Sequence, residues 1–346
     1  GLRVGGSALY ALRFSLQSGA GERGGLYKDG ASWTERASDV AHCQFLSNTA
    51  GYNGGGFYFT DAERTDHPRI EYCTFTGNRA VTVAGGGFSM DLGRKDGSGG
   101  ARIFGCTFVH NVNKKAESYY VDNTYGLPIH TFEVDSCVFK GRDSISILFS
   151  SGSLYKSMLI ITRCFFEAPG MIYMTDADTL IADKCSFTPY PSTRYLGIFV
   201  QTSYYAVFKN IYMKKKGRIG NGLRLLLLNS IIEDTSLKQV LENTEVIYNS
   251  LIVAKIIDQN VQPMSIKNSI LIDTDGGGFL PSNTSIDHSF VRMDCAASGI
   301  VCDNGTNLIG IDPLFRDAAN GDYTLLPCSP LINAGDNIAA AGLPTD

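Results

Sequence analysis

The sequence lacks several features that mark common functional classes. No apolar run approaches the roughly eighteen residues that a membrane-spanning helix needs. Lysine and arginine total 30 against 34 acidic residues, which gives a net charge of −4 and no overall positive field to attract nucleic acid. Charged residues make up only 18% of the chain. We therefore expect a globular protein without a transmembrane segment and without a nucleic-acid partner.

Helical patterning is also missing, and proline is scarce. No long window carries the apolar stripe of an amphipathic helix, and 11 prolines stand against 38 glycines. Short runs that alternate apolar and polar residues, such as Phe132-Glu133-Val134 and Glu245-Val246-Ile247-Tyr248, are separated by clusters of Gly, Asn, Asp and Ser. This pattern predicts short β-strands joined by tight turns. It disfavours helical and leucine-rich solenoids.

What the chain does contain is a recurring phrase: a small or polar residue, any residue, then a large apolar one. Successive copies lie about thirty residues apart at first and about twenty later, the spacing of a solenoid that stacks copies of itself. The series opens with Leu12-Arg13-Phe14 and closes with His288-Ser289-Phe290. Between them, the copies that begin with cysteine run from Cys43-Gln44-Phe45 to Cys185-Ser186-Phe187, and those that begin with asparagine run from Asn210-Ile211-Tyr212 to Asn268-Ser269-Ile270.

A repeat of this length, made of two or three short strands and their turns, closes one coil of a parallel β-helix. We predict an all-β, right-handed parallel β-helix of about 12 coils. The β-helix is expected over residues 1–306, with wider coils in the N-terminal half, and an irregular cap over 307–346. We align the cysteines and asparagines in one slot, where stacked asparagine side chains would hydrogen-bond to the next copy.

Two further phrases recur only in the N-terminal half. Gly55-Gly56 and Gly86-Gly87 each precede an aromatic residue, and Asn48, Asn78 and Asn111 each follow the large apolar residue by three. Glycine pairs before an inward-facing strand indicate a sharp bend. We expect projecting loops at 61–69, 91–100 and 112–129.

The nine cysteines fall into two sets. Six occupy the repeat slot and are expected to be buried free thiols, since free cysteine behaves as a small hydrophobe. Cys295 and Cys302 lie close together in a loop rich in Gly, Ser and Asp, where a disulfide is expected, with Cys328 as a rival partner for either. A loop disulfide would indicate an oxidising compartment.

These phrases together resemble two groups of bacterial proteins. Phe-x-x-Asn followed by Gly-Gly, over roughly residues 14–111, is similar to the repeats of polymorphic outer membrane proteins. The tail, from Asp312-Pro313-Leu314-Phe315 to Ser329-Pro330-Leu331-Ile332-Asn333-Ala334-Gly335-Asp336, looks like the end of secreted β-helix proteins with a "choice-of-anchor Q" module. The resemblance implies a right-handed β-helix that bacteria export and often display at the surface. It also implies that the chain is a truncated piece of a longer protein.

The residues of the familiar β-helix enzymes are missing. Pectin hydrolases use clustered aspartates, and no Asp-Asp pair occurs anywhere. Arg218-Ile219-Gly220 lacks the lysine of their Arg-x-Lys phrase, and the Trp-Ile-Asp-His and Arg-x-Pro-x-x-Arg phrases of pectate-type lyases are absent. We therefore favour a non-catalytic protein.

One column of the repeat carries cations. The residues that precede the slot include Arg163, Lys184 and Lys209, and Asp135 and Asp183 lie one position earlier. Cations stacked on adjacent coils repel unless an anion or a neighbouring acid relieves them. The column is a candidate groove for an acidic polysaccharide, and a solvated face with local Asp partners is the alternative.

Tyrosines gather near this column, and a second segment is a candidate calcium loop. Tyr190, Tyr204 and Tyr205 are candidate platforms for sugar rings. The run from Asp273 to Gly278 places two acids beside flexible glycines, a weak signal for calcium, for which a simple turn is the alternative. The histidines have no metal-ligand spacing, so no metal site and no catalytic residue is assigned.

Three functions fit this sequence. The first is a secreted or surface-displayed bacterial β-helix that adheres to glycan or another surface ligand without catalysis. The second is a lyase acting on uronate-containing polysaccharide, with Lys184, Lys209 or Arg163 as the base. The third is a structural spacer that displays another domain.

Overall fold

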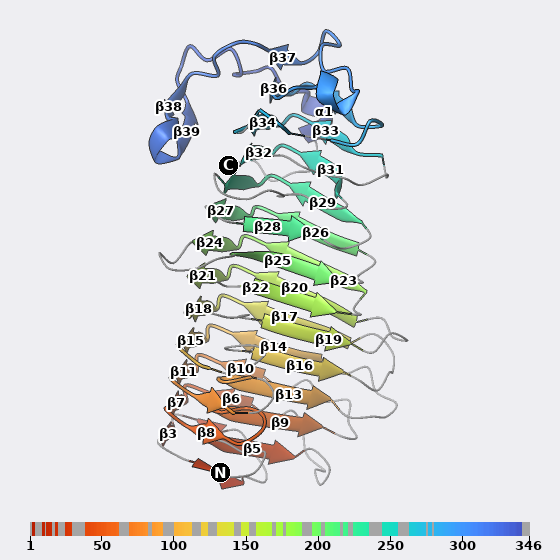
Figure 1. Cartoon of the computed structure of the whole chain (residues 1–346). Coiled ribbons are helices and arrows are strands. Elements are labelled where there is room, and N and C mark those ends of the chain that lie inside the picture. The colour runs from red at the N-terminus through yellow and green to blue at the C-terminus, as the bar shows by residue number, and fades with distance from the viewer. Residues whose placement is uncertain are drawn as a thin grey trace. The chain divides into compact units, whose positions relative to one another are not determined.

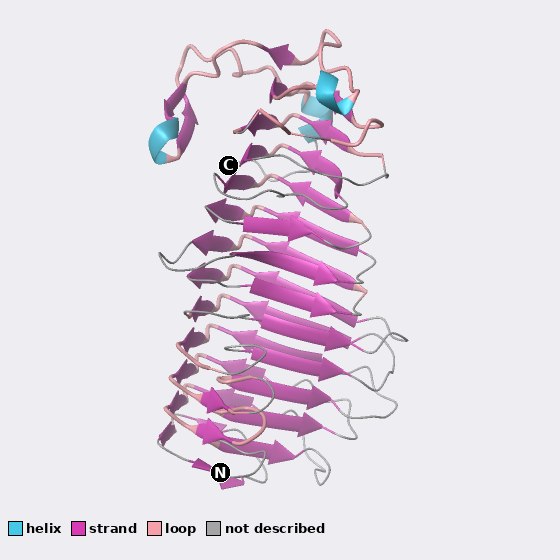
Figure 2. Ribbon diagram, in the orientation of Figure 1, coloured by secondary structure: helices cyan, strands magenta, loops and turns pink. Residues whose placement is uncertain are grey.

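The computed structural model is built almost entirely of short parallel strands (Figures 1 and 2). It divides into two units, Gly1–Tyr205 (unit 1) and Ala206–Asp346 (unit 2). The described residues are 2–3, 9–10, 12–15, 18–19, 25–29, 39–61, 69–81, 85–92, 100–112, 119–123, 130–141, 147–151, 157–167, 171–175, 178–188, 196–201, 205–214, 217–220, 224–234, 244–254, 263–274, 276–278 and 280–340.

Three long parallel sheets run through unit 1, and they confirm the predicted right-handed parallel β-helix. Sheet A is ordered β1 (Leu2–Arg3), β5 (Leu26–Asp29), β9 (Phe57–Asp61), β13 (Phe88–Leu92), β16 (Tyr119–Asn123), β19 (Ile147–Ser151), β22 (Met171–Thr175) and β25 (Leu196–Gln201). Sheet B is ordered β2 (Leu9–Tyr10), β6 (Asp39–Ala41), β10 (Arg69–Glu71), β14 (Gly100–Phe104), β17 (His130–Asp135), β20 (Ser157–Thr162) and β23 (Thr179–Asp183).

Sheet C contains the cysteine phrases. It is ordered β3 (Arg13–Ser15), β7 (Gln44–Leu46), β11 (Thr74–Thr76), β15 (Thr107–Val109), β18 (Val138–Lys140), β21 (Phe165–Glu167) and β24 (Ser186–Thr188). The first coils add a fourth strand in a small sheet D, made of β4 (Ser18–Gly19), β8 (Thr49–Ala50) and β12 (Arg79–Ala80). This extra strand widens the first three coils.

Unit 2 continues the pattern with shorter coils. Sheet B strands here are β26 (Tyr205–Lys209), β29 (Leu225–Leu228), β31 (Thr244–Tyr248), β33 (Ser265–Lys267) and β35 (Ser285–Asp287). Sheet C strands are β27 (Tyr212–Lys214), β30 (Ile231–Asp234), β32 (Leu251–Ala254), β34 (Ile270–Asp273), β36 (Phe290–Arg292) and β37 (Leu308–Ile309). Sheet A contributes β28 (Gly217–Gly220). β28 is the last described strand of sheet A, so the later coils of unit 2 contain described strands of sheets B and C.

The core of unit 1 is a column of stacked phenylalanines. Phe45, Phe75, Phe108, Phe139, Phe166 and Phe187 are at most 1% exposed. Their ring centroids lie 4.7–5.0 Å apart, with neighbouring ring planes within 5° of parallel. Parallel strands place equivalent residues one strand spacing apart, about 4.8 Å, which matches the stacking distance of offset aromatic rings. The predicted register of these six residues is confirmed.

A true asparagine ladder lies in unit 1, at the third phrase. Asn48, Asn78 and Asn111 are fully buried. The Asn78 side-chain oxygen accepts hydrogen bonds from the backbone and side-chain nitrogens of Asn48, each at 3.0 Å. Asn111 accepts from Asn78 in the same way, at 3.0 and 2.9 Å. The ladder therefore satisfies polar groups that would otherwise be buried without partners.

The glycine pairs allow close contact between coils. An ideal Cβ on Gly55 would lie 2.4 Å from the carbonyl oxygen of Gly86, and Gly54 has a left-handed φ of 60°. Only glycine fits so close to the backbone of the next coil.

The alignment of the second half of the repeat is off by one residue. Each described corner between sheets B and C is one residue with a left-handed backbone. These residues are His42, Tyr72, Gly105, Ser136, Arg163 and Lys184 in unit 1, and Asn210, Asn229, Asn249, Asn268 and His288 in unit 2. The asparagine is thus equivalent to the residue before each cysteine, and the cysteine is equivalent to the next residue, serine in four coils. The prediction that the asparagines share the cysteine slot is wrong, because asparagine tolerates the left-handed corner better than most residues. The predicted hydrogen bond between successive asparagine copies is present at one pair of corners, where Asn229 Nδ2 donates to Asn210 Oδ1.

Hydrogen bonds establish that cysteine and serine occupy one slot. Cys73 donates from its backbone nitrogen to the sulfur of Cys106 at 3.4 Å, and the Cys106 thiol donates to the carbonyl of Phe104 at 3.4 Å. Likewise, Ser230 donates from its nitrogen to Ser250 Oγ at 3.1 Å, and that hydroxyl donates to the carbonyl of Tyr248 at 2.9 Å. Either side chain therefore links two consecutive coils and closes its own corner.

The one-residue shift in alignment also changes which large apolar residues of unit 2 point into the core. Ile232, Ile252 and Leu271 are the inward residues, fully buried, whereas Ile231 in the predicted core slot is 38% exposed. One step along a strand moves a side chain to the opposite face. The apolar residues on both faces explain the continuous apolar runs in β32 and β34.

The tail covers the outer face of sheet C in unit 2. β37 pairs with β36, with Leu308 opposite Phe290, so the ladder extends into the segment predicted as a cap. Beyond it, β38 (Phe315–Asp317) and β39 (Asp322–Leu325) form an antiparallel hairpin around the short helix η3 (Ala318–Asn320), and α1 (Asn337–Ala340) follows. Phe315, Tyr323 and Leu331 pack on a cluster that includes Val253 and Ile272.

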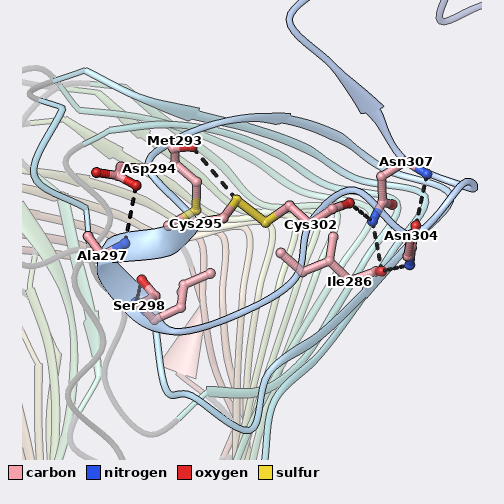
Figure 3. Close-up of a disulfide and its surroundings, with 10 residues drawn as sticks. Ile286, Met293, Asp294, Cys295, Ala297, Ser298, Cys302, Asn304 and Asn307 are labelled. Atoms are coloured by element: carbon pink, nitrogen blue, oxygen red, sulfur yellow. Dashed lines mark hydrogen bonds between the residues drawn. A yellow bond between two sulfur atoms is a disulfide. The ribbon is translucent and has the colours of Figure 1, made fainter.

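A disulfide-closed loop lies beside the last strands (Figure 3). Cys295 and Cys302 are joined, with Cα atoms 6.1 Å apart, around the short helix η2 (Ala296–Ser298), while Cys328 is free and exposed. Asn304 and Asn307 both donate from their side-chain nitrogens to the carbonyl of Ile286 at 2.8 Å. The segment after the loop thereby supplies hydrogen bonds to the outer edge of β35, the last strand of sheet B.

The shared slot predicts how single substitutions behave. Cys106→Ser should keep the acceptor for the Cys73 nitrogen and the donor to Phe104. Cys106→Ala should leave that buried N–H without its partner, which costs roughly 1–3 kcal/mol. We expect urea denaturation followed by circular dichroism to rank serine above alanine. Equal stability of the two variants, or a less stable serine variant, would contradict the slot assignment.

Thiol labelling gives a second test. Burial raises the pKa of the Cys106, Cys137 and Cys164 thiols well above their usual range, so these groups are neither accessible nor ionised. In the folded protein we expect a maleimide to label Cys328 rapidly and the six buried thiols only after denaturation. Mass spectrometry of the labelled peptides reads this out. Rapid labelling of Cys106 in the native state would contradict the buried ladder.

Candidate ligand-binding surface

The corners between sheets B and C in unit 1 present a column of outward side chains. Because the residue after each corner points into the core, the corner residue itself points to solvent. We call this set the corner column; it consists of His42, Tyr72, Gly105, Ser136, Arg163 and Lys184. Each has a left-handed φ between 52° and 61°. His42, Tyr72, Arg163 and Lys184 are exposed.

One end of the corner column is an aromatic platform. The rings of His42 and Tyr72 stack with centroids 5.1 Å apart and planes 16° from parallel. Phe104 meets Tyr72 edge-on at 5.2 Å, and the guanidinium of Arg102 lies 5.4 Å from the centre of the Phe104 ring. Tyr72 remains 50% exposed. The platform thus offers a flat aromatic face with a cation beside it.

Glycine at the next corner makes room for the platform. A Cβ on Gly105 would lie 2.7 Å from the Tyr72 ring, which is closer than carbon atoms normally approach. The Tyr72 ring therefore lies over the backbone of the following coil. Any larger residue at Gly105 would displace it.

The other end of the column is basic, and an acid already neutralises part of it. Arg163 donates from Nε to Oδ1 of Asp135 at 2.9 Å, and its Nη2 contacts Oδ2 of the same carboxylate. Burial acts to raise the pKa of Asp135, but hydrogen bonds from Arg163, Thr162 and Ser136 lower it below its ordinary value. The carboxylate is therefore ionised at neutral pH and relieves the charge of Arg163.

The three stacked cations expected from the sequence are reduced to two. Arg163 and Lys184 are corner residues on adjacent coils, since the backbone N–H of Arg163 donates to the carbonyl of Asp183. Lys209 is the last residue of β26 and precedes the corner Asn210. It therefore has the strand-end position that Asp183 has in unit 1. The one-residue shift in the repeat alignment accounts for this difference.

The remaining candidates do not extend the surface. Tyr205 is 36% exposed at the start of β26. Tyr190 and Tyr204 lie outside the described residues, as do most of the loops expected to project. Asp273 accepts a hydrogen bond from the Gly278 nitrogen at 2.8 Å, so it closes a turn, while Asp275 is outside the described residues. Within the described ranges no group of three metal-binding side chains comes together.

The platform residues His42, Tyr72, Phe104 and Arg102 were not among the sequence candidates. His42 and Tyr72 both stand directly before a cysteine, in the same position as Arg163 and Lys184. Extending that position toward the N-terminus would have found them. Phe104 and Arg102 belong to β14 and reach the platform through sheet register, with Arg102 opposite Arg69 and Phe104 opposite Glu71.

Comparison with protein-family models, with curated proteins and with solved structures finds no match to this chain. Among the described residues, no helix is long and apolar enough to cross a membrane. We therefore assign the protein to a fold class, the right-handed parallel β-helix.

The Arg163–Asp135 pair predicts a pH dependence of stability. Because the folded-state pKa of Asp135 is lowered, its contribution is present above the unfolded pKa of about 3.9 and is lost as pH falls through the folded value. We expect Asp135→Asn to lower the urea midpoint at pH 7 and to lower it much less at pH 3. Glu133→Gln, at an exposed neighbour, serves as control. A difference between wild type and Asp135→Asn that does not shrink at pH 3 would refute the pairing.

Proposed function

We propose that the protein is an exported, non-catalytic β-helix that binds glycan along the corner column of unit 1. The observation that supports this most is the choice of corner residues. Left-handed backbone costs a residue other than glycine of order 1–3 kcal/mol. Unit 2 uses asparagine at four of its five described corners and histidine at the fifth, whereas unit 1 uses His, Tyr, Arg and Lys at four of its six described corners, beside one glycine and one serine. Large exposed side chains at strained corners indicate a role outside the fold itself.

The chemistry of the column suits a sugar chain. Aromatic faces pack against the apolar faces of sugar rings, and His42 and Tyr72 offer such a face on adjacent coils. Lys184 offers a cation to uronate carboxylates, and Arg102 offers a second one beside its own partner Glu133, which lies 3.7 Å from its Nε. The rigid ladder places these groups at regular steps of about 4.8 Å, so that one extended polymer could contact several coils.

The proposal that the protein is exported and displayed at the bacterial surface rests on the sequence resemblance and on one structural feature. The similarity to polymorphic outer membrane protein repeats and to choice-of-anchor Q proteins supports bacterial export and surface display. The Cys295–Cys302 disulfide is the kind of bond that persists in an oxidising compartment. Both support a secreted or surface location.

Catalysis by lyase chemistry has less support. Hydrogen bonding to Asp135 raises the pKa of Arg163 above its ordinary value, which makes this guanidinium a poor base. Lys209 is not part of the corner column. Lys184 keeps its predicted corner position without the acid that pairs with Arg163, and the described residues bring no group of three acidic, histidine or cysteine side chains together beside it.

Glycan-array binding with matched variants tests the proposal. Tyr72→Ala should weaken binding about tenfold through loss of ring stacking, and Lys184→Ala should weaken binding of acidic glycans selectively. The controls are Tyr52→Ala, an equally exposed tyrosine at 43%, and Lys140→Ala, whose amine is paired with Glu167. If the wild type binds no glycan, or if Tyr52→Ala loses as much as Tyr72→Ala, the proposal fails. Accumulation of unsaturated sugars from polyuronate would instead support a lyase.

A further inference from the structure

A groove opens between the tail and the outer face of sheet C in unit 2. It has a volume of about 440 Å³, within the range of small-molecule sites. Its floor is one side-chain column along β30, β32, β34 and β36: Glu233, Val253, Ile272 and Arg292 lie opposite one another in register. The tail hairpin supplies the facing wall, with Phe315 and Tyr323.

The groove has an apolar middle and charged ends. Val253 and Ile272 are 8% and 2% exposed and form the apolar part of the floor. Phe315 and Tyr323 meet edge-on with centroids 5.2 Å apart. Glu233 and Arg292 are three strand spacings apart, roughly 14 Å. A ligand of modest size therefore reaches one charged end and the apolar middle together.

The acidic end is the buried one. Glu233 is only 6% exposed, whereas Arg292 is exposed to solvent. Burial, followed by the negative charge of Glu233, raises the pKa of Tyr323 to about 12, and the two side chains share a hydrogen bond. The Tyr323 hydroxyl therefore stays neutral at physiological pH. Asp312 adds a second carboxylate to the lining.

These charges select the sign of the ligand. Arg292 and Asp312 are both exposed, so water screens their opposite charges, and Glu233 is the buried charge of the groove lining. A buried carboxylate is stabilised by a cation that enters beside it. Aromatic walls favour the same sign, because ring faces attract ammonium groups. An anion would instead meet Glu233 at the buried end.

We propose that this groove binds a small amphipathic amine, with its ammonium group on Glu233 and its apolar body against the groove lining formed by Val253, Ile272, Phe315 and Tyr323. The site lies in unit 2 and is independent of the glycan surface proposed for unit 1. Its failure would leave that proposal intact.

Phenethylamine is a suitable probe, with 2-phenylethanol as its neutral analogue and 3-phenylpropionate as its anionic analogue. Titration calorimetry of the whole chain should rank the amine above the alcohol and the acid last. Glu233→Gln should weaken the amine at least about tenfold, since a charge-assisted hydrogen bond is lost. Glu245→Gln, which alters an exposed ion pair with Arg224 in the same unit, should leave affinity unchanged.

Two further variants make the result decisive. Arg292→Gln should strengthen amine binding, because it removes the opposing charge. Ala319→Trp, at the exposed rim of the groove, should block the amine without touching the core. Circular dichroism shows whether each variant is folded. If Glu233→Gln does not fold, amine binding by Ala319→Trp tests the proposal instead. No amine binding, equal binding of amine and alcohol, or undiminished binding by folded Glu233→Gln or Ala319→Trp would overturn the proposal.

Discussion

The structure depends on one repeated corner, in which a left-handed residue is followed by an inward cysteine or serine. The inward side chain accepts from the backbone of the preceding coil and donates to the carbonyl two residues before it in its own coil. One small side chain therefore satisfies two backbone groups that the turn would otherwise leave buried without partners. Everything around it follows in register: inward rings on sheet C, outward corner residues, and strands that superpose from coil to coil.

The two units fill this frame differently. Unit 1 stacks phenylalanines inside and adds the buried asparagine ladder in its first coils, so its outer surface is free to present His42, Tyr72 and Lys184. Unit 2 has smaller aliphatic residues inside and apolar residues on the outer face of sheet C as well. That second apolar face requires a cover, which Phe315, Tyr323 and Leu331 of the tail provide. The groove exists because the cover is incomplete between Glu233 and Arg292.

The period of the apolar residues was enough to predict the fold, because each coil must return to the same place and the spacing allows little else. The register of Phe45 through Phe187 followed directly from the cysteine phrase. The second half was misaligned because Asn229-Ser230-Ile231 has the same small-any-large form as Cys43-Gln44-Phe45. Sequence alone does not show that asparagine takes the left-handed corner. The ion pair of Arg163 with Asp135 matched the alternative that acids relieve the column. The platform of Tyr72 and Phe104 joins a corner residue to a strand residue of the next coil, a contact that the spacing of the corners alone does not reveal.

The cost of the left-handed backbone at each corner links the fold to the proposed function. A corner occupied by asparagine or glycine forms with little strain, as Gly105 and Asn229 illustrate. Tyrosine and lysine at the same backbone geometry cost more, and their side chains point away from the core, where they cannot recover that cost by burial. Stacking of Tyr72 on His42 and pairing of Arg163 with Asp135 offset part of it. Lys184 makes no such aromatic stack among the described residues, so its presence at a strained corner is the feature of unit 1 that the fold explains least and that an external anionic ligand would explain best.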